Sequence, residues 1–372
     1  MSNDFSDLCL RQSDVDQYVV GCDIGGANIK VADNRGRAIA INFPMWLKWA
    51  ELGSSLATLV QSFPLNDATH FAITMTGELA DCFETRREGV QQILRQVEKV
   101  FAPERTAVYA VGDRWLSPAE ACQQPWEVAA SNWFALATWI GACTHSQLHL
   151  VLDIGSTTVD IIPMKPDSAG KLRVATRART DRDRLQLGQL VYTGLERTPI
   201  AAILNAVTVH GERCPVMAER FATSDDCYVL LGFTPEFPDD SDSADNRPRT
   251  KSCAHARLAR MVGEDVETLS IEAAIEIADQ CIDAQAAQVA QAIERNLRAL
   301  ETENRSACQV TVVGHGRALA ERALGRLTDR PLAVTWLADQ LSPDIARCAP
   351  AVAVAELRAA CFQRAVNNLR FP

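Results

Sequence analysis

The sequence predicts a mixed α/β protein built from two similar halves, and three observations support this prediction. The chain has 372 residues, which exceeds the size that a single hydrophobic core comfortably fills. Segments typical of strands and of helices alternate along most of its length. The stretch VVGCDIGGANIKVADN at 19–34 has a counterpart in LVLDIGSTTVDIIPM at 150–164. In both, a strand reaches Asp-Ile-Gly and continues through a glycine turn into a second strand, which suggests a repeated plan.

The first half is expected to open with three strands joined by tight turns, because GGA and NRGR separate runs of β-forming residues. Helices and strands then alternate up to residue 143. The expected strands lie at 18–24, 28–33, 37–43, 69–75 and 106–112, and the expected helices at 49–62, at 88–100 and in the segment that ends at 143.

The second half restarts in the same way, with strands expected at 148–154, 158–164 and 172–176. A long helix at 270–303 carries apolar residues at intervals of three and four, so one face should pack on the second core. The last helix is expected to return to the first half. We therefore place the first domain at 1–146, joined by the closing helix 350–372, and the second domain at 147–349.

The composition is that of an ordinary globular protein, with 47% hydrophobic and 23% charged residues. The net charge of −10 argues against a nucleic-acid or polybasic membrane-surface protein, because both need clustered lysine and arginine. The start, MSNDFSDLCLRQ, has no features of a secretory signal. The uncharged stretch 128–152 divides into a helix and a strand. We expect a cytoplasmic protein without nucleic-acid or membrane partners, and the sequence leaves the oligomeric state, including a homo-oligomer, open.

The twelve cysteines are scattered with no CxxC pair. A chain of this length does not need a disulfide framework, so we expect reduced thiols, mostly in the core. Cys253 and His255 have a spacing that suits half of a zinc site, but no second pair at metal-site spacing accompanies them. A structural or accidental placement is the better interpretation of that pair.

An acidic segment, SDDCYVLLGFTPEFPDDSDSADNRPRTK, occupies 224–251. Seven acidic residues and no basic residue lie between 225 and 245, and three prolines punctuate the segment. Composition alone favours a solvated loop. Whether the segment 225–245 binds a ligand is left open.

The two Asp-Ile-Gly turns predict a phosphate-binding cleft. A glycine turn between strands directs successive backbone N–H groups into one concavity, which binds phosphate. Asp23 and Asp153 would face each other and hold Mg²⁺ through its waters, and Lys30 would add a positive charge. A plain hairpin explains a single such turn equally well, but two copies favour the cleft. The predicted phosphate contacts are Gly25, Gly26, Asn28, Lys30, Gly155, Ser156, Thr157 and Thr158.

A third glycine turn lies in VVGHGRALAERAL at 312–324, where a strand is followed by Gly-x-Gly and a helix. This pattern suits a nucleotide or another flat ligand group near Gly314 and Gly316. His315 lies inside the turn and is the best placed of the six histidines. A histidine at this position also suits a bond to a backbone group.

The three turns resemble the phosphate-one, phosphate-two and adenosine motifs of the superfamily of actin, sugar kinases and heat-shock chaperones. This resemblance implies an actin-like ATPase (ribonuclease H-like) fold with its cleft between two similar domains. The chain is more closely similar to the hydantoinase and oxoprolinase branch. Three segments resemble a small family linked to tetrahydromethanopterin-dependent one-carbon metabolism: TMTGELADCFETRREGV (74–90), LGQLVYTGLERTPIAAI (187–203) and DSADNRPRTK (242–251).

The resemblance implies a Mg²⁺-dependent condensing enzyme for a methanofuran-like carrier. Such an enzyme joins a tyramine phenol, carried as a γ-glutamyl derivative, to an aminomethylfuran diphosphate. Pyrophosphate leaves, and the phenol oxygen captures the electron-rich furfuryl cation. Ala27 stands where sugar kinases usually have threonine after the paired glycines, so kinase chemistry fits less well and ATP is a weaker candidate ligand than a diphosphate.

Glu78 directly follows an expected strand and is predicted to accept the phenol proton. The alternative is an acid that satisfies the backbone donors of a helix N-terminus. Lys30 is the second predicted catalytic residue. Arg86, Arg87 and Arg249 are candidates for binding the γ-glutamyl carboxylates or the diphosphate, and Asp242 and Asp245 for binding the cationic aminomethyl group or a second metal.

Two other functions stay open. The first is ATP-dependent hydantoin or oxoproline hydrolysis, in which a lactam oxygen is phosphorylated, although oxoprolinase-type activity commonly relies on a second large subunit. The other is a nucleotide-switched regulator without small-molecule turnover. A regulator has no need for Glu78, Arg249 and the acidic segment to converge on the cleft.

Overall fold

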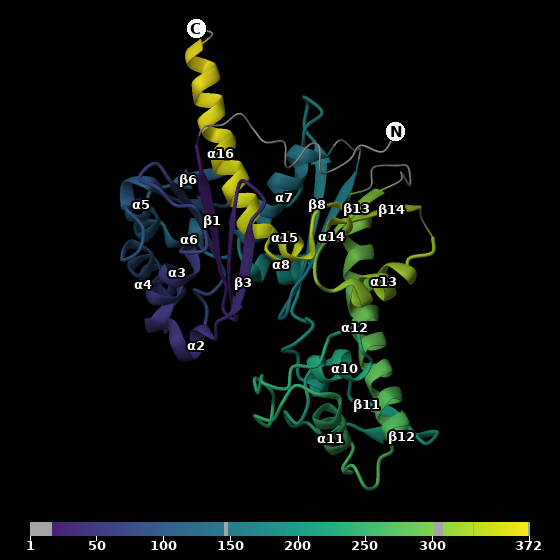
Figure 1. The fold of residues 1–372 in the computed structure, drawn as a ribbon. Coiled ribbons are helices and arrows are strands. Elements are labelled where there is room, and N and C mark those ends of the chain that lie inside the picture. Colours follow the sequence, from purple (N-terminus) through teal and green to yellow (C-terminus); the bar gives the residue numbers. More distant parts are fainter. Residues whose placement is uncertain (1–16, 145–147, 301–307, 330, 371–372) are drawn as a thin grey trace.

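The computed structural model describes residues 17–144, 148–300, 308–329 and 331–370. Its first sheet has the strand order β3-β2-β1-β4-β5-β6 (Figure 1). The central strand β1 pairs antiparallel with β2 and parallel with β4. The strands are β1 (Val19–Ile24), β2 (Asn28–Asp33), β3 (Ala38–Asn42), β4 (His70–Met75), β5 (Thr106–Ala110) and β6 (Arg114–Leu116).

The second sheet repeats this plan with the order β10-β8-β7-β13-β14, and β9 pairs with β8. Here β7 pairs antiparallel with β8 and parallel with β13. The strands are β7 (His149–Ile154), β8 (Val159–Pro166), β9 (Leu172–Val174), β10 (Leu190–Val191), β13 (Cys308–Gly314) and β14 (Leu332–Trp336). The duplicated strand order confirms the predicted two-domain, actin-like α/β fold.

Helices cover both faces of each sheet. On the outer face of the first sheet lie α3 (Leu52–Val60) and α4 (Arg86–Glu98), and on that of the second sheet α12 (Ile271–Leu300) and α13 (Arg317–Gly325). Two helices, α7 (Asn132–Cys143) and α16 (Ala349–Arg370), lie between the sheets and share one hydrophobic core with both (Figure 1). The shorter helices are α2 (Met45–Lys48), η1 (Trp49–Glu51), η2 (Pro103–Arg105), α5 (Pro118–Gln123), α6 (Pro125–Val128), α8 (Asp181–Leu187), α14 (Leu337–Gln340) and α15 (Pro343–Arg347).

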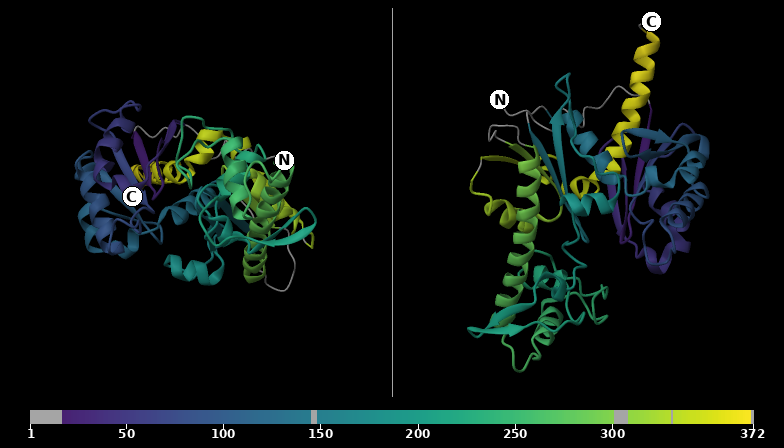
Figure 2. Two further views of the ribbon diagram at one scale, coloured as in Figure 1. Left: turned by 90° about the horizontal axis from the view of Figure 1, so that it is seen from below. Right: turned by 180° about the vertical axis from the view of Figure 1, so that it is seen from behind.

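A third unit extends from the second sheet along α12, as the views in Figure 2 show. It consists of α9 (Ile200–Ile203), the hairpin β11 (Ala206–Val209) and β12 (Glu212–Pro215), α10 (Ser224–Leu230) and α11 (Lys251–Met261). Its helices α10 and α11 pack against each other and against α12. The acidic segment therefore begins inside a packed unit.

The expected elements are confirmed with boundary shifts of a few residues, except that the region 49–62 is divided between η1 and α3. The stretch 128–152 contributes to α7 and β7, and no helix in the described part of the chain has the length and apolar character needed to cross a bilayer. Buried thiols include Cys22, Cys227 and Cys281, whereas Cys143 is disulfide-bonded, so the expectation of reduced thiols is wrong at that position. The predicted domain division at 146/147 lies outside the described residues.

The contact between α16 and β1 depends on Gly21. A Cβ atom at this position would lie 2.1 Å from the carbonyl oxygen of Ala351 and 3.0 Å from the amide nitrogen of Ala355. Both neighbours are backbone atoms of α16, so they cannot move aside by a change of rotamer. The absence of a side chain at Gly21 lets the closing helix lie directly on the central strand of the first sheet.

Gly21→Ala is expected to lower the free energy of unfolding by about 1–3 kcal/mol, because the added methyl group overpacks the contact between helix and sheet. Urea denaturation measures the change. Gly325→Ala is the matched control, since its added Cβ meets no atom within 4 Å and alanine has the higher helix propensity. Equal stability of Gly21→Ala and the wild type would contradict the close packing of α16 on β1.

Candidate active site

The two Asp-Ile-Gly turns meet in the cleft between the sheets. Each is closed by the same bond, since Gly25 N–H donates to the Asn28 carbonyl and Gly155 N–H donates to the Thr158 carbonyl, both at 3.0 Å. The Asn28 side chain also donates to the Ser156 hydroxyl at 3.2 Å. One predicted phosphate turn from each half therefore contacts the other, although the individual phosphate contacts remain predictions.

Three charged side chains lie behind these turns. Asp23 is 2% exposed, and its Oδ2 lies 3.7 Å from Lys30 Nζ. Burial raises the pKa of the Asp23 carboxyl and raises that of Asp153 to about 7, while Lys30 opposes both shifts. Burial also disfavours the charged form of Lys30, but Asp23 and Asp153 more than offset it and raise the lysine pKa. Lys30 is thus the positive charge that stabilises the ionised forms of both buried carboxyl groups, and it only partly offsets the effect of burial on their pKa values.

The residues of this site fit a divalent cation. Asp23 Oδ1 is buried and has no hydrogen-bond partner among the described residues, and carboxylate oxygens are the ligands that Mg²⁺ prefers. The described residues contain no group of three or more histidine, cysteine, aspartate or glutamate side chains arranged to hold a metal. Asp23 and Asp153 would therefore share an ion whose other ligands are waters and substrate oxygens, as is usual for Mg²⁺.

Glu78 lies close to the first glycine turn. The preceding residue, Gly77, donates its N–H to the Ile24 carbonyl at 3.0 Å. Glu78 is 1% exposed, its Oε1 lies 3.5 Å from Arg86 Nε, and its Oε2 has no partner among the described residues. Burial raises the pKa of Glu78 to about 7, although Arg86 opposes the shift. A carboxyl group with this pKa is suited to exchanging protons near neutral pH.

Glu78 does not cap the helix that follows it, although the backbone N–H groups of Glu78 and Ala130 lower the pKa of its carboxyl and partly oppose the effect of burial. The next helix, α4, is capped by Thr85, whose hydroxyl accepts a hydrogen bond from Glu88 N–H. Arg86 instead connects the two halves, because its guanidinium also pairs with Asp181 of α8 at 2.6 Å. Arg86 therefore holds Glu78 in place and is already engaged with two carboxylates, while Arg87 is exposed on α4.

The third glycine turn packs on the end of β7. Gly314 has a φ of 83°, and a Cβ atom there would lie 2.2 Å from the Ile154 carbonyl oxygen. A Cβ atom at Gly316 would lie 2.1 Å from Ile154 Cγ2. Close packing thus explains both glycines, and nucleotide contacts at this turn stay a prediction. His315 Nε2 lies 3.4 Å from Glu196 Oε1, so the histidine faces a carboxylate rather than a backbone group.

The acidic segment is held by arginines, which corrects the solvated-loop interpretation for its first part. Asp225 and Asp226 are buried in α10. Asp225 binds Arg249 through two hydrogen bonds of 2.7 and 2.9 Å, and Asp226 accepts a bond from Arg257 at 2.7 Å. Arg249 lies at the far end of the same segment and Arg257 beyond it in α11, so the run of acidic residues at 225–245 does not reveal this pairing.

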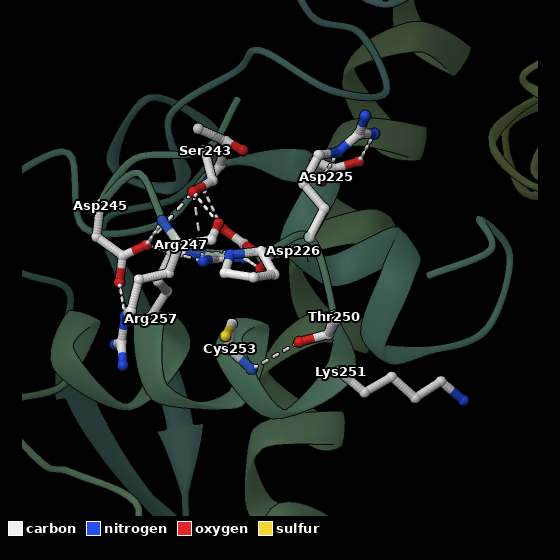
Figure 3. Close-up of polar contacts among 12 residues, drawn as sticks. Asp225, Asp226, Ser243, Asp245, Arg247, Thr250, Lys251, Cys253 and Arg257 are labelled. Atoms are coloured by element: carbon white, nitrogen blue, oxygen red, sulfur yellow. Dashed lines mark hydrogen bonds and ion pairs between the residues drawn. The ribbon is translucent and has the colours of Figure 1, made fainter. Parts of the chain in front are cut away.

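The predicted ligand residues Arg249 and Asp245 belong to the same network. Arg249 also pairs with Asp240 at 2.8 Å. Asp245 accepts from Arg257 at 2.9 Å and from Arg247 at 2.8 Å (Figure 3). Both residues therefore fix the loop through these pairs. Near this network, His255 Nε2 lies 2.8 Å from the Leu269 carbonyl oxygen, which fits the structural role expected for it.

A pocket opens between the first half and the third unit. Asp242 lies at its rim, where the Asn42 side chain donates to Asp242 Oδ2 at 3.4 Å. Arg197 lies with its guanidinium carbon 3.9 Å from the centre of the Trp46 ring, which also connects the two halves. The lining residues are Ala27, Asn42, Glu196, Arg197, Arg220, Thr223, Asp225, Asp242, Ser243 and Arg249.

Several of these residues were not predicted from the sequence, notably Arg197 and Arg220 in the pocket and Asp181 beside Arg86. Arg197 lies in the segment 187–203, which carried part of the family resemblance. Its partner Trp46 comes from the other half, about 150 residues earlier in the sequence. These side chains come together only in the folded protein, where the two halves lie on either side of the cleft.

Fold and site define a two-domain protein of the actin-like type, with its candidate site in the cleft between the domains. Residues 70–360 match the family model of hydantoinase/oxoprolinase. The chain belongs to this family.

Two relatives carry the name (4-{4-[2-(gamma-L-glutamylamino)ethyl]phenoxymethyl}furan-2-yl)methanamine synthase. The protein from Methanocaldococcus jannaschii is 30% identical over 344 residues, covering 91% of this chain and 97% of its own. The protein from Methanococcus vannielii is 24% identical over 209 residues, or 56% of this chain and 89% of its own. Among solved structures, nucleotide-free acetone carboxylase aligns with a TM-score of 0.48 and 10% identity, over 91% of this chain and 70% of that chain.

Proposed function

We propose that this chain is a synthase that joins a γ-glutamyl tyramine phenol to an aminomethylfuran diphosphate with release of pyrophosphate. The carbon–oxygen bond to the diphosphate breaks, pyrophosphate takes the electron pair, and the phenol oxygen bonds to the furfuryl carbon. The product is the ether in the name of the Methanocaldococcus jannaschii relative. The observation that carries the proposal is the buried Glu78 carboxyl, with a pKa of about 7, beside a glycine turn suited to a diphosphate.

The backbone N–H groups of the two glycine turns and the Lys30 side chain are assigned the binding of the diphosphate. Backbone N–H groups at a glycine turn form an anion-binding concavity, and Lys30 is held in its charged form by Asp23 and Asp153. These two carboxylates would hold Mg²⁺, which when bound supplies charge neutralisation to phosphate oxygens. The chain thereby stabilises charge that develops on the leaving group, which is the interaction that lowers a reaction barrier.

Glu78 is assigned the phenol proton. A phenol is almost wholly protonated at neutral pH because its ordinary pKa is about 10. The unpartnered Oε2 accepts the proton as the carbon–oxygen bond forms, and Arg86 fixes the carboxylate through Oε1.

The direct test incubates the purified chain with Mg²⁺, γ-glutamyltyramine and the aminomethylfuran diphosphate. Mass spectrometry should show the ether, and pyrophosphate should appear in equal amount. Omission of either organic substrate should stop both ether formation and pyrophosphate release. Pyrophosphate without ether, or no reaction of the furan diphosphate, would contradict the proposed activity.

ATP hydrolysis by the chain is expected to be negligible, because no phosphoryl group needs to be transferred and Ala27 replaces a hydroxyl-bearing residue. With Mg²⁺ present, pyrophosphate should raise the melting temperature more than ATP does, since a ligand bound only by the folded state stabilises it. Thermal shift and a phosphate-release assay measure the two effects. ATP turnover that depends on an added hydantoin or lactam would favour the hydrolase function of the wider family instead.

A further inference from the structure

The pocket between the first half and the third unit is lined by two arginines that take no part in the ion-pair networks described above. In the described part of the chain, neither Arg197 nor Arg220 forms an ion pair through its side chain, whereas Arg249 in the same pocket is paired with two aspartates. Burial lowers the pKa of Arg197, Asp242 opposes this shift, and Arg220 adds to it. The positive charges of Arg197 and Arg220 and the negative charge of Asp242 are therefore close enough to interact electrostatically.

This arrangement favours an anionic ligand group beside the arginines. A partly desolvated guanidinium without a hydrogen-bonded anion is costly, and Arg197 is fixed in the pocket by its contact with Trp46. Two neighbouring guanidiniums suit a carboxylate, which accepts several charge-assisted hydrogen bonds. The arginine pair thus marks one end of a subsite.

The acidic rim favours a cationic group on the same ligand. Asp242 is exposed, and among the residues that the structure describes its side chain accepts only the weak, 3.4 Å bond from Asn42, so it can still bind an ammonium group. Glu196 adds a second carboxylate to the lining. A diphosphate carries only negative charge and would be repelled by these carboxylates, whereas a zwitterion matches both ends of the pocket.

We propose that this pocket is the subsite for the α-amino acid end of the γ-glutamyl group, with Arg197 and Arg220 binding the α-carboxylate and Asp242 binding the α-ammonium group. A γ-linked glutamate keeps both α groups free and charged. The pocket borders the first phosphate turn through Ala27, so the phenol end of the substrate extends toward the reacting centre. The assignment rests on the proposed function for the identity of the substrate, but binding can be measured without turnover.

The test compares the binding of γ-glutamyltyramine and N-acetyltyramine by titration calorimetry, because the second phenol keeps the amide and lacks both α groups. Arg220→Gln should raise the Kd for γ-glutamyltyramine at least about tenfold, as expected for the loss of a charge-assisted hydrogen bond. The Kd for N-acetyltyramine and the KM for the furan diphosphate should not change. Arg213→Gln is the matched control, since Arg213 is exposed on β12 and does not line the pocket.

A second variant tests the cationic end. Asp242→Asn should abolish the preference for γ-glutamyltyramine over its α-N-acetylated form, while the wild type prefers the free amine. The assignment would be overturned if Arg220→Gln weakened the binding of γ-glutamyltyramine and of N-acetyltyramine equally. It would also be overturned if either variant weakened only the binding of the furan diphosphate. If the wild type binds γ-glutamyltyramine selectively but forms no ether, the subsite stands and the proposed reaction fails.

Discussion

Asp153→Asn is expected to lower turnover at least about a thousandfold, because a metal-assisted interaction with a leaving phosphate is worth several kcal/mol and each 1.4 kcal/mol is a factor of ten. Asp23→Asn should have the same effect, since one carboxylate from each half would serve the same ion. Asparagine keeps the shape of the side chain and removes the charge. Steady-state kinetics over a range of Mg²⁺ concentrations measures the loss.

The fold should survive both substitutions. Burial raises the pKa of Asp23 and of Asp153, which means that the ionised carboxylates are disfavoured in the folded protein and a neutral amide is not. Each variant also removes one of the two carboxylates that stabilise charged Lys30, so the two effects oppose each other and melting temperatures should stay close to the wild-type value. Asp67→Asn, at an exposed position, is the control for general effects of lost charge. Normal turnover of either cleft variant at limiting Mg²⁺ would refute the two-turn site.

Glu78→Gln is expected to lower turnover at pH 7 by a factor of about 10²–10⁴, the usual contribution of a general base. With a pKa of about 7, Glu78 becomes more ionised as the pH rises through neutrality, so wild-type turnover should rise over the same range. Asp153 also has a pKa of about 7, so the comparison is made at saturating Mg²⁺, which would keep that carboxylate ionised. Under this condition the variant should lack the dependence and should recover partly toward the phenol pKa near 10. Kinetics across this pH range distinguish the two profiles.

Stability provides the control for Glu78→Gln. Because the folded-state pKa lies above the ordinary value of 4.5, the folded protein binds the extra proton and wild-type stability falls as the pH rises between these values. Glutamine removes that loss, so the variant should be no less stable than the wild type at pH 8. Glu104→Gln, at an exposed position, should leave activity unchanged. Near-normal turnover of Glu78→Gln at pH 7 would show that ionisation of the furan limits the rate.

The strands and helices that build the two sheets were predictable because their patterns are long. The turns after Asp23 and Asp153 each separate two strands of six or more residues, which gives a clear periodic signal. In contrast, β6, β10 and the hairpin β11–β12 have only two to four residues per strand. Such short segments are held by tertiary contacts and carry little pattern of their own.

The parts of the candidate site that were predictable are those whose charged residues lie within one short segment of the sequence. Asp23 and Lys30 lie on adjacent strands of one hairpin and are directly opposite in register. The partners of the arginines were not predictable, because Arg249 pairs with Asp225 over 24 residues and Arg86 pairs with Asp181 over 95 residues. The acidic segment therefore suggested a solvated loop, although its arginine partners bury the first two aspartates.

The most direct measurement of the central claim follows the phenol oxygen. The reaction is run with γ-glutamyltyramine carrying ¹⁸O in the phenol and with unlabelled furan diphosphate, and both products are analysed by mass spectrometry. If the cleft expels pyrophosphate from the furan and the phenol attacks, the ether retains the full label and the pyrophosphate contains none. Label in pyrophosphate or phosphate would show that the phenol oxygen is the one that leaves, and would contradict attack by the phenol on the furfuryl carbon.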